Sequence, residues 1–333
     1  MIRIGIDTGG TFTDLVVLDD TTGGVQTIKV ASTPDDPALA PLMALKQCGV
    51  PVGDIERLVL GTTIATNAGL QKRGATVLYV GTEGFQDVPI IARIDRKEAY
   101  NPSWPKPDAG VRRRHVFGIS ERVDHKGKVL KSLEDGELDR LGDWVSDWLC
   151  NNPECNWAVA VNLLFSYVRP EHELKIGAYL AKRFPDLPVS LSSEVAPIWR
   201  EYERGTTTIV DASIKQLLAR FAERLTDELD TLGVTAPLTL MKSNGGHADA
   251  ATASDLPVQI FLSGLAGGVI AGGGLRRRRQ RQYPGAGFST GSGRLASPWY
   301  RQLRGYGVAN LFLPSRPAPA HASDCARGNG DRC

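Results

Sequence analysis

The sequence predicts an α/β protein that begins with a ribonuclease-H-like domain, and two observations support this prediction. First, three apolar segments rich in β-branched residues follow one another directly at the start of the chain. Second, the segments after them alternate between the spacing of a helix and that of a buried strand. Rossmann folds and TIM barrels alternate from their first strand, so the three opening strands argue against both.

The elements of this first region can be placed by residue. The three opening strands are predicted at Ile2–Ile6, Phe12–Leu18 and Val25–Val30. The next elements are predicted to be a helix over Asp35–Gln47, a strand over Arg57–Leu60, a helix over Ile64–Arg73 and a strand over Ala75–Val80. Thr62 or Thr63 is placed to cap the start of the second helix, and Gly74 is placed to end it.

Residues 85–133 are less regular and rich in Arg, Pro and Asp, so we expect an insertion or a lobe with short strands there. The alternation of helix and strand patterns then resumes. The expected helices are Leu133–Leu149, Pro170–Arg183, Thr206–Leu232 and Ala248–Ser254, and the expected strands are Ala158–Leu164, Val189–Ser192, Leu238–Met241 and Val258–Leu262. The longest helix carries one apolar stripe and stops at Gly233.

Charge is divided unevenly along the chain. The net charge of +2 combines −7 over residues 1–274 with +9 over residues 275–333, where 11 arginines occur without a lysine. This last segment is rich in Arg, Gly, Pro and Ser and has no periodicity, which predicts a disordered tail. A reading-frame shift near codon 274 of a GC-rich gene would produce such a composition. A basic arm that binds nucleic acid is the less favoured interpretation.

The sequence favours a soluble, cytoplasmic protein. Val258–Leu275 is nearly uncharged and precedes Arg276–Arg279, which is the pattern of a membrane helix with a positive flank. Its six glycines favour instead a buried strand that runs into a glycine-rich turn. The five cysteines form no Cys-x-x-Cys pair and the histidines are scattered, so no zinc site is predicted. Sparse cysteine and no signal peptide indicate the cytoplasm.

The turn after the first strand carries the clearest chemical signal. Gly9 and Gly10 allow the backbone to approach a polyphosphate and to aim N–H groups at it. The flanking hydroxyls are those of Thr8, Thr11 and Thr13. Asp7 and Asp14 place an acid on each side, and Asp7 is suited to hold a hydrated Mg²⁺. An ordinary glycine hairpin turn is the alternative, and the chain contains no Walker loop.

Other polar segments also follow predicted strands. Gly61–Asn67 ends a strand and begins a helix, where free N–H groups attract anionic or carbonyl-bearing ligands. The alternative is a plain helix cap, which would account for only part of the polar side chains in this segment. Ser243–Gly246 and Ser263–Gly268 are glycine-rich turns that either approach a ligand or only reverse the chain. Arg200–Arg204 is interpreted as a solvated helix face, and no histidine is assigned a catalytic role.

Together these segments resemble the hydantoinase A/5-oxoprolinase family, which includes ATP-dependent N-methylhydantoinase A-like enzymes and subunits of acetone and acetophenone carboxylases. Their order and spacing over some 270 residues carry the resemblance. The matching segments are Gly5–Asp14, Gly61–Asn67, Gly84–Val88, Glu121–Asp124, Ser193–Val195, Arg200–Arg204, Ser243–Gly246 and Ser263–Gly268.

The resemblance implies an actin-like ATPase fold, in which two ribonuclease-H-like halves close on Mg-ATP. Members use ATP to phosphorylate a cyclic amide or a carbonyl oxygen, and they work with a companion hydantoinase B-type subunit. The implied catalytic residues are Asp7, Asp14, Thr62, Thr63 and Asn67, with Asp7 as the metal ligand. The implied nucleotide-binding residues are Thr8, Gly9, Gly10, Thr11, Thr13, Gly264, Gly267 and Gly268. Residues 1–200 would form the N-terminal region and 201–274 the start of the core domain.

The sequence also departs from the family pattern. Leu265 stands where the family has a proline, and a second phosphate turn of the Asp-x-Gly-Gly-Thr-Ser type is absent from residues 275–333. We therefore expect the N-terminal half of the fold with an incomplete second half, truncated at its C-terminus. The leading expectation is an ATP-dependent hydrolase of a cyclic amide of the 5-oxoproline or hydantoin type, impaired by truncation. A ketone carboxylase subunit and a non-catalytic product are the alternatives.

Overall fold

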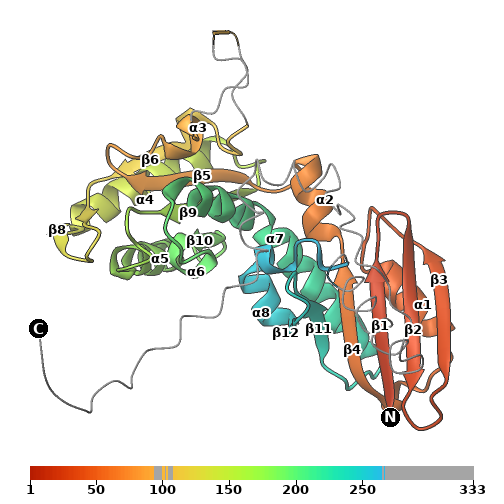
Figure 1. Ribbon diagram of the computed structural model, residues 1–333. Helices are drawn as coiled ribbons and strands as arrows, with labels where there is room; N and C mark the ends of the chain where they lie inside the picture. Colours follow the sequence, from red (N-terminus) through yellow and green to blue (C-terminus); the bar gives the residue numbers. More distant parts are fainter. Residues whose placement is uncertain (94–99, 102, 104–107, 265, 267–333) are drawn as a thin grey trace, which may run out of the picture.

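The computed structural model describes residues 1–93, 100–101, 103, 108–264 and 266, which form two β-sheets bridged by one long helix (Figure 1). The first sheet has the strand order β12-β11-β4-β1-β2-β3. Its strands are β1 (Ile2–Thr8), β2 (Phe12–Asp19), β3 (Val25–Ala31), β4 (Ile55–Thr62), β11 (Leu238–Met241) and β12 (His247–Asp249). β1, β4 and β11 run parallel, while β1, β2 and β3 form an antiparallel meander.

The first sheet is covered on one face and open on the other. Side chains alternate along each strand, so Ile4, Ile6, Leu15 and Val17 enter the core while Asp7 faces outward. Helix α1 (Leu39–Gln47) and the C-terminal half of α7 (Glu201–Thr231) supply the opposing apolar side chains. On the open face, Phe12 and Val16 remain 49% and 41% exposed.

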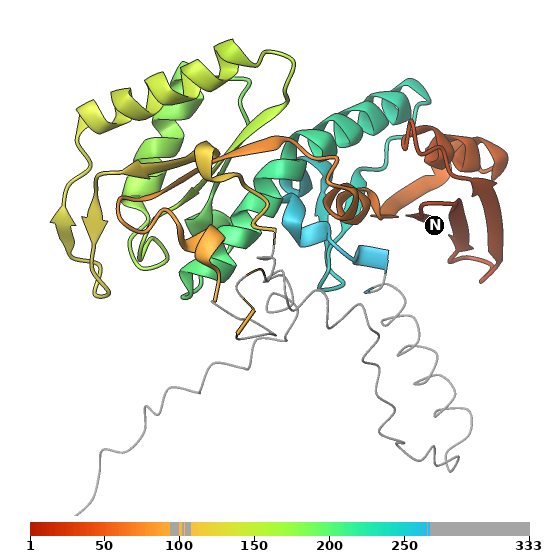
Figure 2. The same ribbon diagram turned by 90° about the horizontal axis from the view of Figure 1, so that it is seen from above.

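The second sheet is fully parallel and covered on both faces (Figure 2). Its order is β10-β9-β5-β6, with β5 at Thr76–Thr82, β6 at Val116–Ile119, β9 at Trp157–Asn162 and β10 at Val189–Leu191. Helices α4 (Asp135–Asn151) and α5 (Glu171–Arg183) pack on one face, and the N-terminal half of α7 packs on the other. Double coverage explains why β9 is buried at every position.

Several short elements complete the described residues. They are the helices α2 (Ile64–Gln71), α3 (Val88–Ile91), α6 (Ser192–Val195) and α8 (Ala250–Asp255), the 3₁₀ turns η1 (Val52–Asp54), η2 (Arg113–His115) and η3 (Pro257–Ile260), and the hairpin strands β7 (Arg122–Val123) and β8 (Val129–Lys131). Within the region from 85 to 133, β6 belongs to the second sheet and β7 and β8 form a separate two-stranded ribbon.

The predicted α/β class and ribonuclease-H-like order are confirmed, but the chain follows a different route from the one expected. The strand after α2 does not join the first sheet. β5 starts the second sheet, and β11 fills the place beside β4 after α7 has returned the chain. The first sheet is therefore built from two stretches separated by the whole second sheet.

Predictions for four elements were wrong. The helix predicted over Asp35–Gln47 begins only at Leu39. Val258–Leu262 is not a strand, because Pro257–Ile260 forms a 3₁₀ turn and Leu262 takes a left-handed φ of 58°. α7 begins at Glu201 instead of Thr206. α2 ends at Gln71 with Lys72 in the left-handed conformation, so Gly74 does not end it. The Gly74 position is needed for a close crossing, since an added Cβ would lie 2.5 Å from the carbonyl oxygen of Ser213 in α7.

Parts of the sequence that carried predictions lie outside the described residues. They are Leu265, Gly267, Gly268 and the predicted tail, 275–333. Among the residues that are described, no helix combines the length and apolar character needed to cross a membrane.

Candidate active site

Four segments converge at one edge of the first sheet. They are the turn between β1 and β2, the end of β4, the start of α2 and the segment at Ser263–Gly264. β1 and β4 are parallel neighbours, and the register pairs Asp7 with Gly61 and Thr8 with Thr62, so both strands end at the same edge. The sequence identified each of these segments separately, and the structure brings them together.

The glycine turn is held in shape by backbone and hydroxyl contacts. The N–H of Gly9 donates to the carbonyl of Phe12 at 3.0 Å, and a Cβ on Gly9 would lie 3.0 Å from that same oxygen. The Ser32 hydroxyl donates to the carbonyl of Gly9 at 2.8 Å and lies 3.0 Å from Thr13 Oγ1. Gly10 and Thr11 remain exposed at the tip. The N–H of Ser32 donates to the carbonyl of Thr11 at 2.9 Å, so the turn has an exposed tip on a braced base.

The predicted hydroxyl donors occupy two different environments. Thr8 and Thr13 are cross-strand partners with buried side chains, on the face opposite Asp7 and Asp14. Thr13 braces Ser32, whereas Thr8 Oγ1 is buried without a hydrogen-bond partner among the described residues. Only Thr11 among these threonines is exposed.

The two acids of the turn are directly opposite each other but differ in their partners. Asp7 pairs with Asp14 across the antiparallel ladder. Lys29 Nζ lies 2.7 Å from Asp14 Oδ1, while Asp7 has no ion pair with a described residue. Asp7 is exposed as a residue, yet partial desolvation raises the pKa of its carboxyl group, and repulsion from Asp14 raises that pKa further. Asp7 is thus a carboxylate that gains from a nearby cation.

Glycines leave space around the Asp7 carboxylate. A Cβ on Gly61 would lie 3.1 Å from Asp7 Oδ1, and one on Gly264 would lie 3.5 Å from the same atom. Side chains at these positions would crowd the carboxylate. The described residues contain no group of three or more His, Cys, Asp or Glu side chains that could hold a metal ion. One open carboxylate fits a magnesium ion whose other ligands are phosphates and water, not a site made wholly of protein ligands.

The start of α2 is tied to β1 by Thr63 and Asn67. Thr63 donates to the carbonyl of Thr8 through its N–H at 3.1 Å and through its hydroxyl at 3.2 Å. Asn67 Nδ2 donates to Thr63 Oγ1 at 3.1 Å, and a Cβ on Gly10 would lie 3.7 Å from that amide. Thr63 holds the cap position of α2 but makes no side-chain cap bond, and the Thr62 hydroxyl accepts the N–H of Ile64 at 3.2 Å instead. These bonds position α2 beside the turn.

The Ser263–Gly264 segment is joined to the same edge by side-chain bonds. The Ser263 hydroxyl donates to the carbonyl of Thr62 at 3.2 Å and accepts its N–H at 3.4 Å. The N–H of Leu262 donates to Thr66 Oγ1 at 3.1 Å. The sequence singled out the serine–glycine segment but gave no sign of the bracing roles of Ser32 and Thr66, which depend on contacts between distant segments.

A second polar centre lies in the other half of the molecule and corrects the interpretation of Arg200–Arg204 as a solvated face. The Arg204 side chain is fully buried. It donates to Asn162 Oδ1 at 2.9 Å and to the carbonyls of Leu163 and Ile198 at 2.7 and 2.9 Å. The nearby buried Glu173 accepts from the N–H of Leu163 at 2.8 Å. These bonds fix the ends of β9 and the start of α7, so the interpretation from sequence was wrong here.

The ribonuclease-H-like sheet, with a glycine turn after its first strand, gives this chain an actin-like ATPase-type fold. Comparison with known proteins agrees with this. Residues 3–184 match the model of the hydantoinase/oxoprolinase N-terminal region, and residues 204–293 match that of the hydantoinase/oxoprolinase domain. The chain therefore belongs to the hydantoinase/oxoprolinase family. The second match extends past residue 274, where we expected the family resemblance to stop.

Relatives of known activity are similar over most of this chain. It is 32% identical over 281 residues to caprolactamase subunit alpha of Pseudomonas jessenii, covering 81% of this chain and 39% of the relative. It is 29% identical to 5-oxoprolinase 1 of Arabidopsis thaliana (81% and 23% covered) and 28% identical to the acetophenone carboxylase gamma subunit of Aromatoleum aromaticum (74% and 35% covered). The chain thus spans at most about two fifths of these relatives.

A solved structure confirms the fold class. The crystal structure of the ATP-dependent caprolactamase from Pseudomonas jessenii matches with a TM-score of 0.70 at 32% identity, covering 79% of this chain and 39% of that chain.

Proposed function

We propose that this chain supplies the first phosphate-binding turn of an ATP-dependent enzyme that hydrolyses a cyclic amide. The observation that carries the proposal is the Asp7 carboxylate, which is open, has no cationic partner among the described residues and is flanked by Gly61 and Gly264. The similarity to a caprolactamase and a 5-oxoprolinase supports the class of substrate. Because the chain spans 39% of the caprolactamase subunit, it would provide one wall of the nucleotide site.

The residues of this wall have separate tasks in the proposed reaction. The exposed backbone of Gly10 and Thr11 would donate N–H groups to phosphate oxygens. Asp7 would hold a magnesium ion through one oxygen or through its water, and that ion supplies charge neutralisation on the phosphates. Thr63 and Asn67 would keep α2 in place beside the phosphates. Phosphoryl transfer to the amide oxygen depends mainly on this positioning.

Titration with ATP, with and without Mg²⁺, tests the proposal on the chain itself. The wild-type chain is expected to bind Mg-ATP weakly and to turn it over little, and the affinity should fall when EDTA removes the metal. Asp7→Asn should weaken Mg-ATP binding by about tenfold, or about 1.4 kcal/mol, and should remove most of the dependence on Mg²⁺. Asp20→Asn is the matched control, because Asp20 lies in the loop that follows β2 and pairs with Arg3.

Two outcomes would contradict the proposal. One is equal Mg-ATP affinity in the wild-type and Asp7→Asn chains. The other is binding in the wild-type chain that does not change when the metal is removed.

A carboxylase subunit is the second candidate, favoured by the similarity to the acetophenone carboxylase gamma subunit. There the same turn would serve ATP use on a ketone. The relatives' names include "subunit alpha" and "gamma subunit", so we also propose a companion subunit of the hydantoinase B type. Reconstitution with a neighbouring B-type gene product, assayed with lactams and with a ketone plus bicarbonate, separates the two candidates. No stimulation by either substrate would favour a non-catalytic chain.

A further inference from the structure

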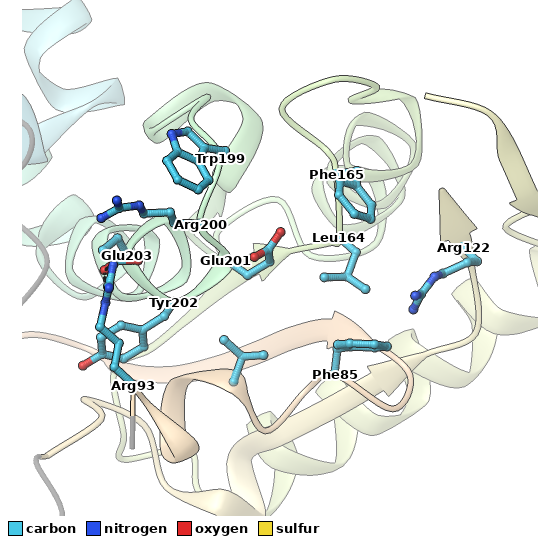
Figure 3. Close-up of a pocket in the computed structure, with 11 residues that line it drawn as sticks. Phe85, Arg93, Arg122, Leu164, Phe165, Trp199, Arg200, Glu201, Tyr202 and Glu203 are labelled. Atoms are coloured by element: carbon cyan, nitrogen blue, oxygen red, sulfur yellow. Dashed lines mark hydrogen bonds and ion pairs between the residues drawn. The ribbon is translucent and has the colours of Figure 1, made fainter. Parts of the chain in front are cut away.

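A pocket of about 560 Å³ lies at the carboxyl edge of the second sheet, away from the phosphate turn (Figure 3). Phe85 follows β5, Arg122 follows β6, Phe165 follows β9, and Glu201 begins α7 after β10. Helix α2 lies beside the phosphate turn, and the segment that leaves α2 contacts α7 at Ser213. The pocket residue Glu201 lies more than three turns of α7 before Ser213, which is about 18 Å. The pocket is therefore a separate cavity.

The topology of the sheet places this pocket where α/β proteins bind ligands. The chain passes from β5 to β6 on one side and then to β9 on the other side of β5. The order reverses between β5 and β9, and the crevice outside the carboxyl ends of two such strands is the usual ligand position in open parallel sheets. The volume falls within the range of small-molecule sites. Phe165 and Arg200, both in the pocket wall, have φ values of 58° and 82°, which residues other than glycine rarely adopt.

Three charged side chains of the pocket wall, Arg122, Arg200 and Glu201, have no ion-pair partner among the described residues. Arg200 stacks on Trp199, with its guanidinium carbon 4.5 Å from the ring centre, and Figure 3 shows it directed away from Phe85 and Leu164. Arg122 stacks on Phe85, with its guanidinium carbon 4.5 Å from the ring centre, and forms no ion pair with a described residue. Figure 3 shows the Glu201 carboxylate directed toward Phe165, with Arg122 on the other side of Leu164. Glu201 has no ion pair with a described residue either, although its charge interacts with the buried Arg204.

Two other charged residues of the pocket wall are paired. Arg93 and Glu203, which also line the pocket, form an ion pair with each other. On the side of the pocket formed by Phe85 and Leu164, a ligand therefore meets the cation of Arg122 and the anion of Glu201, separated by apolar side chains.

We propose that this pocket binds an amino acid as its zwitterion, with the carboxylate on Arg122, the ammonium on Glu201 and the carbon chain against Phe85 and Leu164. Water opens a cyclic amide to a molecule with one carboxylate and one amine, so the ligand class is that of the ring-opened product. That link to the reaction rests on the proposed function. The binding itself depends only on the pocket.

Ligand-detected NMR titration of the full chain, without nucleotide, tests the proposal with three matched probes. The probes are 6-aminohexanoate, hexanoate and hexylamine, which share one carbon chain and differ in their charged ends. We expect 6-aminohexanoate to bind at least tenfold tighter than either singly charged probe. Arg122→Gln should reduce its affinity to that of hexylamine, and Glu201→Gln should reduce it to that of hexanoate.

Two exposed residues outside the pocket provide controls. Arg169→Gln and Glu223→Gln should leave the binding of all three probes unchanged. Arg122→Gln should still bind hexylamine as the wild type does, which shows that the variant is folded. Asp7→Asn should keep wild-type affinity for 6-aminohexanoate, so a failure of nucleotide binding is distinguished from a failure here. Equal affinity for 6-aminohexanoate and hexanoate, or unchanged binding in either pocket variant, would overturn the proposal.

Discussion

Gly74→Ala tests how the two sheets are joined. Gly74 crosses α7 so closely that an alanine Cβ would lie 2.5 Å from the Ser213 carbonyl oxygen, 3.0 Å from its carbonyl carbon and 3.1 Å from its Cβ. An ordinary contact is about 3.4 Å, so the backbone would have to move by about 0.9 Å. The next bond, from the N–H of Ala75 to the same oxygen at 2.7 Å, would be lost or stretched.

The magnitude follows from these two effects. Overpacking against backbone costs about 1–3 kcal/mol, and a lost buried hydrogen bond adds about 1 kcal/mol, so we expect Gly74→Ala to lower the free energy of unfolding by about 2–4 kcal/mol. Gly136→Ala is the matched control, because Gly136 is exposed in the first turn of α4 with nothing within 4 Å of its added Cβ. That change should raise the free energy by about 0.5–1 kcal/mol.

Urea unfolding, followed by tryptophan fluorescence and far-UV circular dichroism, measures both variants. Three of the six tryptophans, Trp144, Trp148 and Trp157, pack in the core of the second sheet and report on it, while the dichroism reports on the whole chain. A Gly74→Ala midpoint within experimental error of wild type would refute the argument, because it would mean that the crossing of α7 is looser than the contacts indicate.

Two further predictions concern buried charges. Burial raises the pKa of Asp211 to about 6, so folding favours its protonated form: its contribution to stability is full below pH 4 and is lost as the pH rises through 6. The difference in free energy of unfolding between wild type and Asp211→Asn, measured by urea titration from pH 4 to 7.5, should therefore change with pH, and a flat difference would contradict the assignment. Arg204→Met should destabilise the chain by about 3–5 kcal/mol, because it leaves Asn162 Oδ1 and the carbonyls of Leu163 and Ile198 without their buried donor. It also removes the positive charge that interacts with the buried Glu173. Arg220→Met, at an exposed position of the same helix, should stay within about 0.5 kcal/mol of wild type in thermal unfolding, and equal loss in both variants would count against a special role for Arg204.

Local patterns were enough to predict most elements of the fold. β1, β2 and β3 lie within two residues of their predicted bounds, because alternation of buried and exposed side chains is written in the segment itself. The sequence of a strand does not show which other strand it pairs with. β5 is apolar on both faces and fits the centre of any parallel sheet, so the sequence could not show that it begins a second sheet. The prediction of a strand at Val258–Leu262 was wrong for a related reason, because a short apolar run is compatible with both a strand and a buried turn.

The candidate site was predicted in parts. Asp7–Asp14 and Gly61–Asn67 could be identified from glycines, hydroxyls and position after strands, and the β1–β4 register explains why they meet. The bracing of Gly9 by Ser32 joins residues 23 positions apart and leaves no local pattern. Arg204 was misjudged because its acceptors are an amide and carbonyls at the ends of other elements, which no charge pattern reveals.

The single helix α7 has a mechanical consequence. It runs unbroken for 31 residues, about 46 Å, with its first turn in the pocket wall and its last turns under the first sheet. A rigid rod of that length acts as a lever: a tilt of one degree about one end moves the other end by about 0.8 Å. At Ser213, about 18 Å along the helix, the same tilt moves the backbone that packs on Gly74 by about 0.3 Å. A shift at the pocket end of α7 would therefore reach the first sheet as a rigid-body movement of the helix.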